Sequence, residues 1–293
     1  MGEGEEELKT KAENHEVEIQ ERGEIFFLYR PKVGKQEVHG PDEVQRLYII
    51  LRPQSGEKTV EEKQCSYGGQ STHTQEVNIE EQPLLRFIIM GRKSLPHPSH
   101  RSRPYWGFVD MVTTNVQDIK TALQGEEYDT STRGHRHISA ARALGEGIYR
   151  ILRHNPRNKN NNHHTHLIYK LQFPAADEKN EPQKSFNIER EGSFVIQIKN
   201  PEQGGAGGSS SQHKRRAQFP AHLQGQFGHK RYYPADPPEF LNFEGCEFLL
   251  ISASDDIEQE LGLELITEGE ECDLVKTFGD AVSTKPLFEG TWV

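Results

Sequence analysis

Short apolar runs rich in β-branched and aromatic residues recur along most of the chain and predict β-strands. Most of the runs end at proline, glycine or a charged residue. Residues 193–199 alternate, with Phe194, Ile196 and Ile198 on the face opposite to Gln197 and Lys199, as in a half-buried strand. The runs interpreted as strands are residues 25–29, 47–51, 85–90, 105–112, 147–152, 166–173, 193–199 and 246–252.

Helical spacing is rare in this sequence. Asn115 resembles an N-cap, Val116, Ile119 and Leu123 follow at helical spacing, and Gly125 ends the pattern. A second short helix is predicted over residues 255–261, with Asp255 at the N-cap, Glu258 at capping-box spacing and Gly262 after it. The fold class predicted is therefore α+β and mostly β, with antiparallel sheets in a sandwich or barrel and one or two short helices.

Polar and low-complexity segments divide the apolar runs. The sequence predicts a disordered acidic tail over residues 1–22, a β-rich half over 23–157 with a polar insertion at 55–82, and a second β-rich half over 165–293 with a flexible Gly/Ser-rich linker at 202–216. The asparagine- and histidine-rich tract 158–164 lies between two predicted strands. It is interpreted either as a domain boundary or as a hairpin loop.

Cysteine usage and the length of the apolar runs indicate in which cellular compartment the protein is expected. The three cysteines, Cys65, Cys246 and Cys272, are odd in number and lack CxxC spacing, which favours neither a disulfide framework nor a cysteine zinc site. No apolar run approaches the roughly 18 residues of a membrane-spanning helix. The acidic first residues do not resemble a signal or transit peptide. We expect a soluble, intracellular protein, cytoplasmic or nuclear, without a membrane partner.

Charge is distributed unevenly along the chain. Residues 86–160 carry a net charge of +7, between segments of −8 and −9. Eight of the 14 histidines lie between His97 and His166, in or just after this basic segment. The sequence therefore suggests a basic surface between acidic ones.

Two basic clusters supply candidate ligand-binding residues. One connects two predicted strands, and the other follows the predicted helix. Arginine presents a planar fork that matches phosphate or carboxylate oxygens, and Gly134 would let a ligand approach the backbone. The alternative is a solvated face that pairs with acidic parts of the same chain. The candidate anion-binding residues are Arg92, Lys93, Arg101, Arg103, Arg133, His135, Arg136, His137 and Arg142.

Metal and catalytic signatures are weak. His135 and His137 would share a strand face, and His163, His164 and His166 supply further imidazoles, but no Asp or Glu lies within five residues of His135 or His137. The chain contains no GxSxG, P-loop, GxGxxG or HExxH motif. The expectation is therefore no metal site, no cofactor and no assigned catalytic residue.

Three runs resemble a conserved family of uncharacterised proteins from plants and some bacteria. They are residues 24–33, 103–110 and 233–241, and the resemblance covers most of residues 24–293. Plant members are sometimes labelled BTB/POZ-domain proteins, which implies protein interaction and a ubiquitin-ligase adaptor role. A BTB module is helix-rich, whereas this chain is rich in predicted strands, and the resemblance adds no catalytic residues.

Three functions are consistent with these patterns. The one favoured is a binding module for a phosphorylated or other anionic ligand, nucleic acid included. The second is a protein-interaction scaffold that uses its acidic segments. The third is an enzyme acting on a phosphorylated or acidic substrate, with His135 or His137 as general acid or base.

Overall fold

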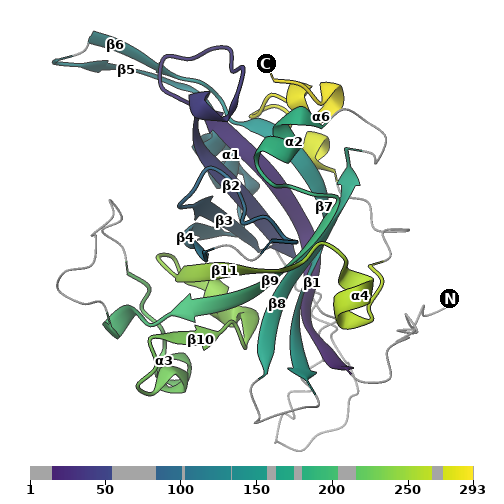
Figure 1. Ribbon diagram of the computed structural model, residues 1–293. Helices are drawn as coiled ribbons and strands as arrows, with labels where there is room; N and C mark the ends of the chain where they lie inside the picture. The colour runs from purple at the N-terminus through teal and green to yellow at the C-terminus, as the bar shows by residue number, and fades with distance from the viewer. Residues whose placement is uncertain are drawn as a thin grey trace, which may run out of the picture.

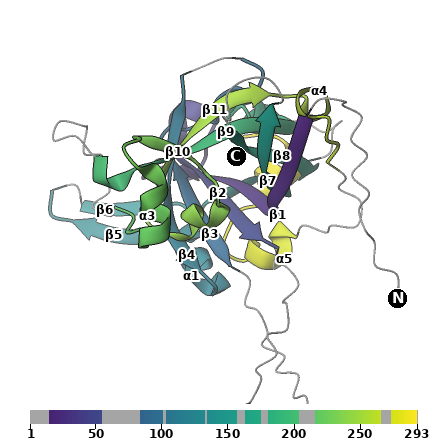
Figure 2. The same cartoon turned by 90° about the horizontal axis from the view of Figure 1, so that it is seen from below.

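Eight antiparallel strands form a closed barrel in the computed structural model (Figures 1 and 2). The structure describes residues 15–54, 84–100, 103–132, 134–156, 163–174, 180–203, 216–265 and 273–292. Neighbouring barrel strands follow the order β9-β11-β4-β3-β2-β1-β7-β8, and β8 pairs with β9 to complete the ring. They are β1 (His15–Pro31), β2 (Val44–Pro53), β3 (Leu85–Met90), β4 (Tyr105–Thr113), β7 (Arg142–Pro156), β8 (His164–Phe173), β9 (Glu191–Lys199) and β11 (Glu247–Ser254).

Strand β9 closes the barrel because its two halves pair with different neighbours along one edge. Residues 191–195 pair with β8, while residues 197–199 pair with the short extra strand β10 (Tyr232–Pro234). The other edge of β9 pairs with β11, from Phe248↔Ile198 to Ser254↔Ser193. Of the two predicted architectures, the barrel is therefore the one observed.

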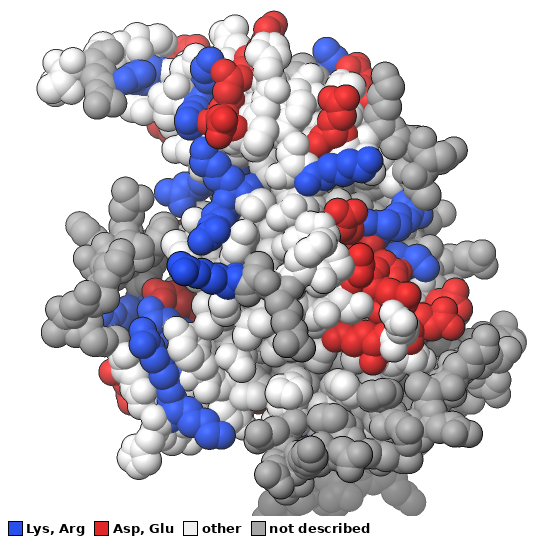
Figure 3. Space-filling model, viewed as in Figure 1, with Lys and Arg blue, Asp and Glu red and all other residues white. Residues whose placement is uncertain are grey.

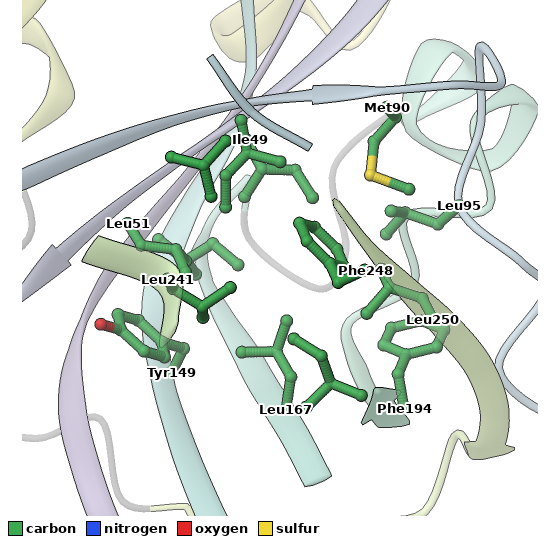
Figure 4. Close-up of a cluster of buried hydrophobic side chains, with 14 of the residues drawn as sticks. Ile49, Leu51, Met90, Leu95, Tyr149, Leu167, Phe194, Leu241, Phe248 and Leu250 are labelled. Carbon is green, nitrogen blue, oxygen red and sulfur yellow. The ribbon is translucent and has the colours of Figure 1, made fainter. Parts of the chain in front are cut away.

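The barrel interior is filled by apolar side chains that alternate along each strand (Figure 4). Side chains from strands far apart in sequence point toward one another there, among them Ile49, Met90, Leu167 and Phe248. Burial of one such side chain contributes about 1.5–3 kcal/mol. Phe186, Phe227 and Phe240 join this cluster from α2 (Glu181–Ser185), α3 (Ala221–Phe227) and the 3-10 helix η3 (Pro238–Asn242) or directly beside them.

Helices bury parts of the outer wall as well. The outward side chains of β1, β2 and β3 pack with α1 (Val116–Leu123), α5 (Leu274–Phe278) and α6 (Lys285–Glu289). Outward side chains of β7 and β8 pack with α4 (Ile257–Leu261). A strand buried on both faces needs no polar alternation. This explains why residues 25–29 and 47–51 are continuous apolar runs.

Most elements match the predictions from sequence. All eight predicted strands are the barrel strands, and α1 is capped by Asn115, whose side chain accepts a hydrogen bond from the Gln117 backbone N–H at 3.1 Å. For α4, the prediction of Asp255 as N-cap is wrong. Asp256 is the cap, because its carboxylate accepts from the Gln259 N–H at 2.8 Å, while Gly262 ends the helix in the left-handed conformation (φ 67°).

Several short elements were not predicted. They are β5 (Glu126–Thr130), β6 (Gly134–Ile138), β10, the helices α2, α3, α5 and α6, and the 3-10 helices η1 (Pro41–Glu43), η2 (Pro201–Gln203) and η3. β5 and β6 are polar and form a separate two-stranded sheet, and the unpredicted α-helices have five or seven residues each. Elements of this length have too little periodicity to stand out.

The two β-rich halves expected from the sequence share one barrel. β7 of the first half pairs with β8 of the second, and β4 pairs with β11. β1 begins at His15, inside the expected tail 1–22, because residues 15–19 pair with the long strand β7. The insertion 55–82 and most of the tract 158–164 and of the linker 202–216 lie outside the described residues. Among the described helices, none has the length and apolar character needed to cross a membrane.

Candidate functional site

A cavity of about 590 Å³ opens on the outer wall of the barrel. Tyr48 of β2 and Phe87 and Ile89 of β3 form its floor, and the C-terminal part of α1 and the start of β5 form one side. The volume lies within the range of small-molecule sites, about 300–1,000 Å³. Its charged lining residues are Arg30, Arg46, Asp110 and Glu126.

Arg30 of β1 and Arg46 of β2 lie directly opposite each other across the strand pair. Both line the cavity, so both side chains are on the outer wall. Like charges directly opposite in a sheet are destabilising. A counter-charge or an anionic ligand beside the pair would offset this repulsion.

The guanidinium of Arg30 is buried, with 7% of the residue exposed, and its hydrogen bonds go only to neutral acceptors. Nε donates to the Tyr48 hydroxyl at 3.1 Å, Nη1 to the Gln124 and Ser139 carbonyls at 3.2 Å each, and Nη2 to the Ala122 carbonyl at 2.6 Å. Within the described ranges, no carboxylate forms a salt bridge with it. The side chain is fixed in place, and among the described residues no ion pair neutralises its positive charge.

Arg46 is half-buried at the same cavity. In the part of the chain that the structure describes, its side chain has neither a salt bridge nor a hydrogen bond. Arginine binds phosphate and carboxylate groups through two parallel N–H donors. Beside the fixed charge of Arg30, Arg46 is therefore the group best placed to hold an anion.

The rest of the cavity suits an apolar or aromatic body with some polar groups. The rings of Tyr48 and Phe87 lie 4.9 Å apart between centroids, at 35°. Asp110 lies on β4, and β3 separates this strand from β2, which carries Arg46. The acidic lining residues Asp110 and Glu126 thus come from other elements than the two arginines.

The first predicted basic segment, between β3 and β4, lies on the surface. Arg92, Lys93 and Arg103 are exposed, and Arg101 lies outside the described residues. The Arg92 guanidinium stacks over the Tyr105 ring, 4.5 Å from its centroid. Although Lys93 is exposed, some loss of hydration, and after it the charge of Lys32, lower the pKa of its side chain. Lys and Arg side chains form a band down one face of the molecule (Figure 3).

The second predicted basic segment is mostly the hairpin β5–β6, and its histidines face acidic side chains. His135 Nδ1 lies 3.2 Å from Asp129 and His137 Nδ1 lies 3.6 Å from Glu127, both across the hairpin. Arg136 is half-buried opposite Tyr128, and Arg133 is outside the described residues. Gly134 adopts φ 64°, so its role in the structure is the hairpin turn.

Arg142 belongs to the barrel end and not to a surface site. It is 6% exposed, donates to the Gln36 carbonyl and lies over the Tyr29 ring at 5.9 Å. The two basic segments approach the same connection between β1 and β2. The Gly34 N–H donates to the His137 carbonyl at 2.8 Å, and the charge of Lys32 lowers the pKa of Lys93. Their candidate side chains do not line the cavity on the outer wall.

A second cavity, of about 500 Å³, lies at the end of the barrel near α3, but its arginine is already neutralised. Arg153 donates to Asp236 through Nε at 2.7 Å and Nη2 at 2.9 Å, and to Glu18 through Nη1 at 3.0 Å. His163 Nε2 lies 3.6 Å from the same Asp236 carboxylate. This network links strands and leaves no uncompensated charge for an anion.

Arg30 and Arg46 were missed by reasoning from sequence. Neither lies in a basic cluster, and what sets them apart is the register of β1 and β2, which the sequence does not show.

Cys246 has the environment expected of a core residue, because it is fully buried and burial raises the pKa of its thiol.

A comparison with protein-family models found no match, and comparisons with curated proteins and with solved structures found none either. The family resemblance expected from the sequence therefore stays a prediction.

Proposed function

We propose that this protein is a binding module for a small ligand that carries a phosphate or carboxylate group, held in the outer-wall cavity by Arg46 beside Arg30. The observation that carries the proposal is the pair of facing arginines without a carboxylate partner among the described residues. An anion between them would offset their repulsion. Arg30 is pre-positioned by four hydrogen bonds, so little conformational entropy is lost on binding.

The floor of the cavity favours a ligand with a flat or apolar body. Tyr48, Phe87 and Ile89 offer an apolar surface, and an anionic group at the arginines would place that body over it. Phenyl phosphate is a suitable probe because it combines both features, and inorganic phosphate tests the anionic part alone.

The experiment is a calorimetric titration of the full chain with both probes. We expect Arg46→Gln to weaken phenyl phosphate binding about 10- to 100-fold, since hydrogen bonds to charged groups contribute about 1.5–3 kcal/mol. Arg46→Lys keeps the charge but not the planar fork, so its affinity should lie between those of the wild type and Arg46→Gln. Arg92→Gln is the matched control, because Arg92 is exposed and lies in the predicted basic segment away from the cavity.

Three results would overturn this assignment. The first is absence of binding by both probes at millimolar concentration. The second is loss of binding in Arg92→Gln with unchanged binding in Arg46→Gln, which would return the anion to the segment between β3 and β4. The third concerns nucleic acid. If binding of a short DNA or RNA falls steeply with salt and ignores Arg46, the ligand is nucleic acid on the basic surface and not a small anion in the cavity.

A further inference from the structure

Asp110 is the extra residue of a β-bulge in β4, and it lines the outer-wall cavity. Phe87 of β3 pairs with Met111 and Ile88 pairs with Val109, so the register leaves Asp110 without a residue opposite it on β3. Met111 packs against the outer apolar cluster, next to the cavity that Asp110 lines. Bulges often re-aim a side chain beside a functional site. This bulge adds a carboxylate to the cavity wall.

Asp110 is half-buried where it lines the cavity. In the part of the chain that the structure describes, its carboxylate takes part in no salt bridge and accepts no hydrogen bond. A charged group that is partly removed from water loses hydration, and only a partner compensates for that loss. A cationic group in the cavity would supply this partner.

Arg46 and Asp110 lie beyond opposite ends of one row of side chains. The row consists of Tyr48, Ile89 and Phe108, which pair across β2, β3 and β4. Arg46 precedes Tyr48 by two residues and Asp110 follows Phe108 by two. β2 and β4 run in the same direction, because each pairs antiparallel with β3. The two charged residues are therefore placed diagonally about Ile89, which belongs to the cavity floor.

The charges that line the cavity balance each other. Arg30 and Arg46 are positive, and Asp110 and Glu126 are negative. A ligand with an anionic group alone would be attracted by the arginines and repelled by the carboxylates. Complementary charge favours a ligand that carries both signs, with the anionic group at the arginines and the cationic group at the acidic side.

We propose that the ligand of the outer-wall cavity is a small zwitterion with an amine, and this inference rests on the function proposed above. Its phosphate or carboxylate binds Arg46, its apolar or aromatic body lies over Ile89, and its ammonium group binds Asp110. An alkylamine is protonated at neutral pH, as lysine is, and its N–H groups donate to a carboxylate. The chemical class is therefore an amine that also carries a phosphate or carboxylate on an apolar body.

The test is a calorimetric titration of the full chain with two probes of the same shape. Tyramine phosphate carries an ammonium group where para-propylphenyl phosphate carries a methyl group. We expect wild type to bind tyramine phosphate about 5- to 10-fold more tightly, between the effects of an exposed ion pair and of a buried charged hydrogen bond. Asp110→Asn should remove this preference. The ratio of the two affinities is the readout, because a change in folding would weaken both probes alike.

Glu126→Gln tests whether Asp110 is the carboxylate that binds the amine. Glu126 also lines the cavity but is exposed at the start of β5, so the preference for tyramine phosphate should persist in this variant. Loss of the preference in Glu126→Gln and not in Asp110→Asn would overturn the assignment to Asp110. Equal affinity of wild type for both probes, with both weakened by Arg46→Gln, would overturn the zwitterion and leave the anion site standing. If neither probe binds, the proposed function fails and this inference fails with it.

Discussion

The guanidinium of Arg86 lies inside the barrel, 1% exposed, and a single carboxylate balances its charge. Nη1 and Nη2 donate to the two oxygens of Glu21 at 2.6 and 2.7 Å, and Nε donates to Asn242 at 2.8 Å. The Tyr149 hydroxyl donates to the same Glu21 at 2.8 Å. These side chains thus form a polar network within the apolar cluster of the barrel interior.

Glu21→Ala should destabilise the protein by about 3–5 kcal/mol, because it leaves a buried charge without its partner. Urea denaturation monitored by fluorescence measures the loss. Glu21→Ala combined with Arg86→Met should lose less than the single variant, since no buried charge remains. A double variant that is less stable than the single one would contradict this account of the pair.

At the scale of elements, α1 depends on its N-cap and also forms one side of the outer-wall cavity. Its first turn is held by Asn115, and its buried face by Ile119 and Leu123. Asn115→Ala should lower the unfolding free energy by about 1 kcal/mol, the usual loss for an N-cap. Asn115→Ser keeps an oxygen acceptor and should lose much less. Equal stability of all three proteins, measured in urea, would show that packing alone holds the helix.

The connection between β10 and η3 is tied to β1 and β7 by Asp236. Burial raises the pKa of Asp236, but the hydrogen bonds from Arg153 and Gln20 outweigh it, so the pKa lies below the ordinary 3.8. A carboxyl group whose pKa is lower in the folded than in the unfolded state stabilises the fold. Its contribution is complete above the unfolded-state pKa and is lost as the pH falls through the folded-state pKa.

Thermal melts from pH 7 to pH 2 should therefore show a loss of stability that begins near pH 4 and continues below it. Asp236→Asn should start less stable at pH 7 and lose less on acidification, because the ionising group is gone. His163 Nε2 lies 3.6 Å from the same carboxylate, so a His163→Gln control separates its contribution. Parallel pH profiles of wild type and Asp236→Asn would contradict this role.

At the scale of the whole molecule, the barrel is closed along two seams between the halves of the chain. β7 pairs with β8 at one seam, and β4 pairs with β11 at the other. Either half alone would expose two unpaired strand edges and its inward apolar face, which favours aggregation.

We expect the fragments 1–160 and 161–293 to be unfolded or aggregated when expressed separately. Mixed or co-expressed, they should recover barrel-like circular dichroism and a cooperative melt. Gel filtration and thermal melts measure both outcomes. Independent cooperative folding of either fragment would instead support the two-domain interpretation of the tract at 158–164.

The sequence by itself determined the barrel strands and the helix capped by Asn115. These are local features, since apolar runs of strand length and a capping residue depend on neighbours in the chain. The polar hairpin β5–β6 and the helices of five to seven residues have weak local signals, so they appeared only in the structure. The sequence correctly showed that the two segments are basic. It did not show that acidic side chains of β5 face His135 and His137 of β6.

Closure and strand register were decided by the tertiary structure alone. The facing of Arg30 and Arg46, the cavity beside them and the position of Asp110 at its wall all depend on which residue lies opposite which. A shift of one residue in register would move each of these side chains to the other face of the barrel. Register is selected by the packing of apolar side chains from distant strands, and this is a property of the folded chain and not of any segment within it.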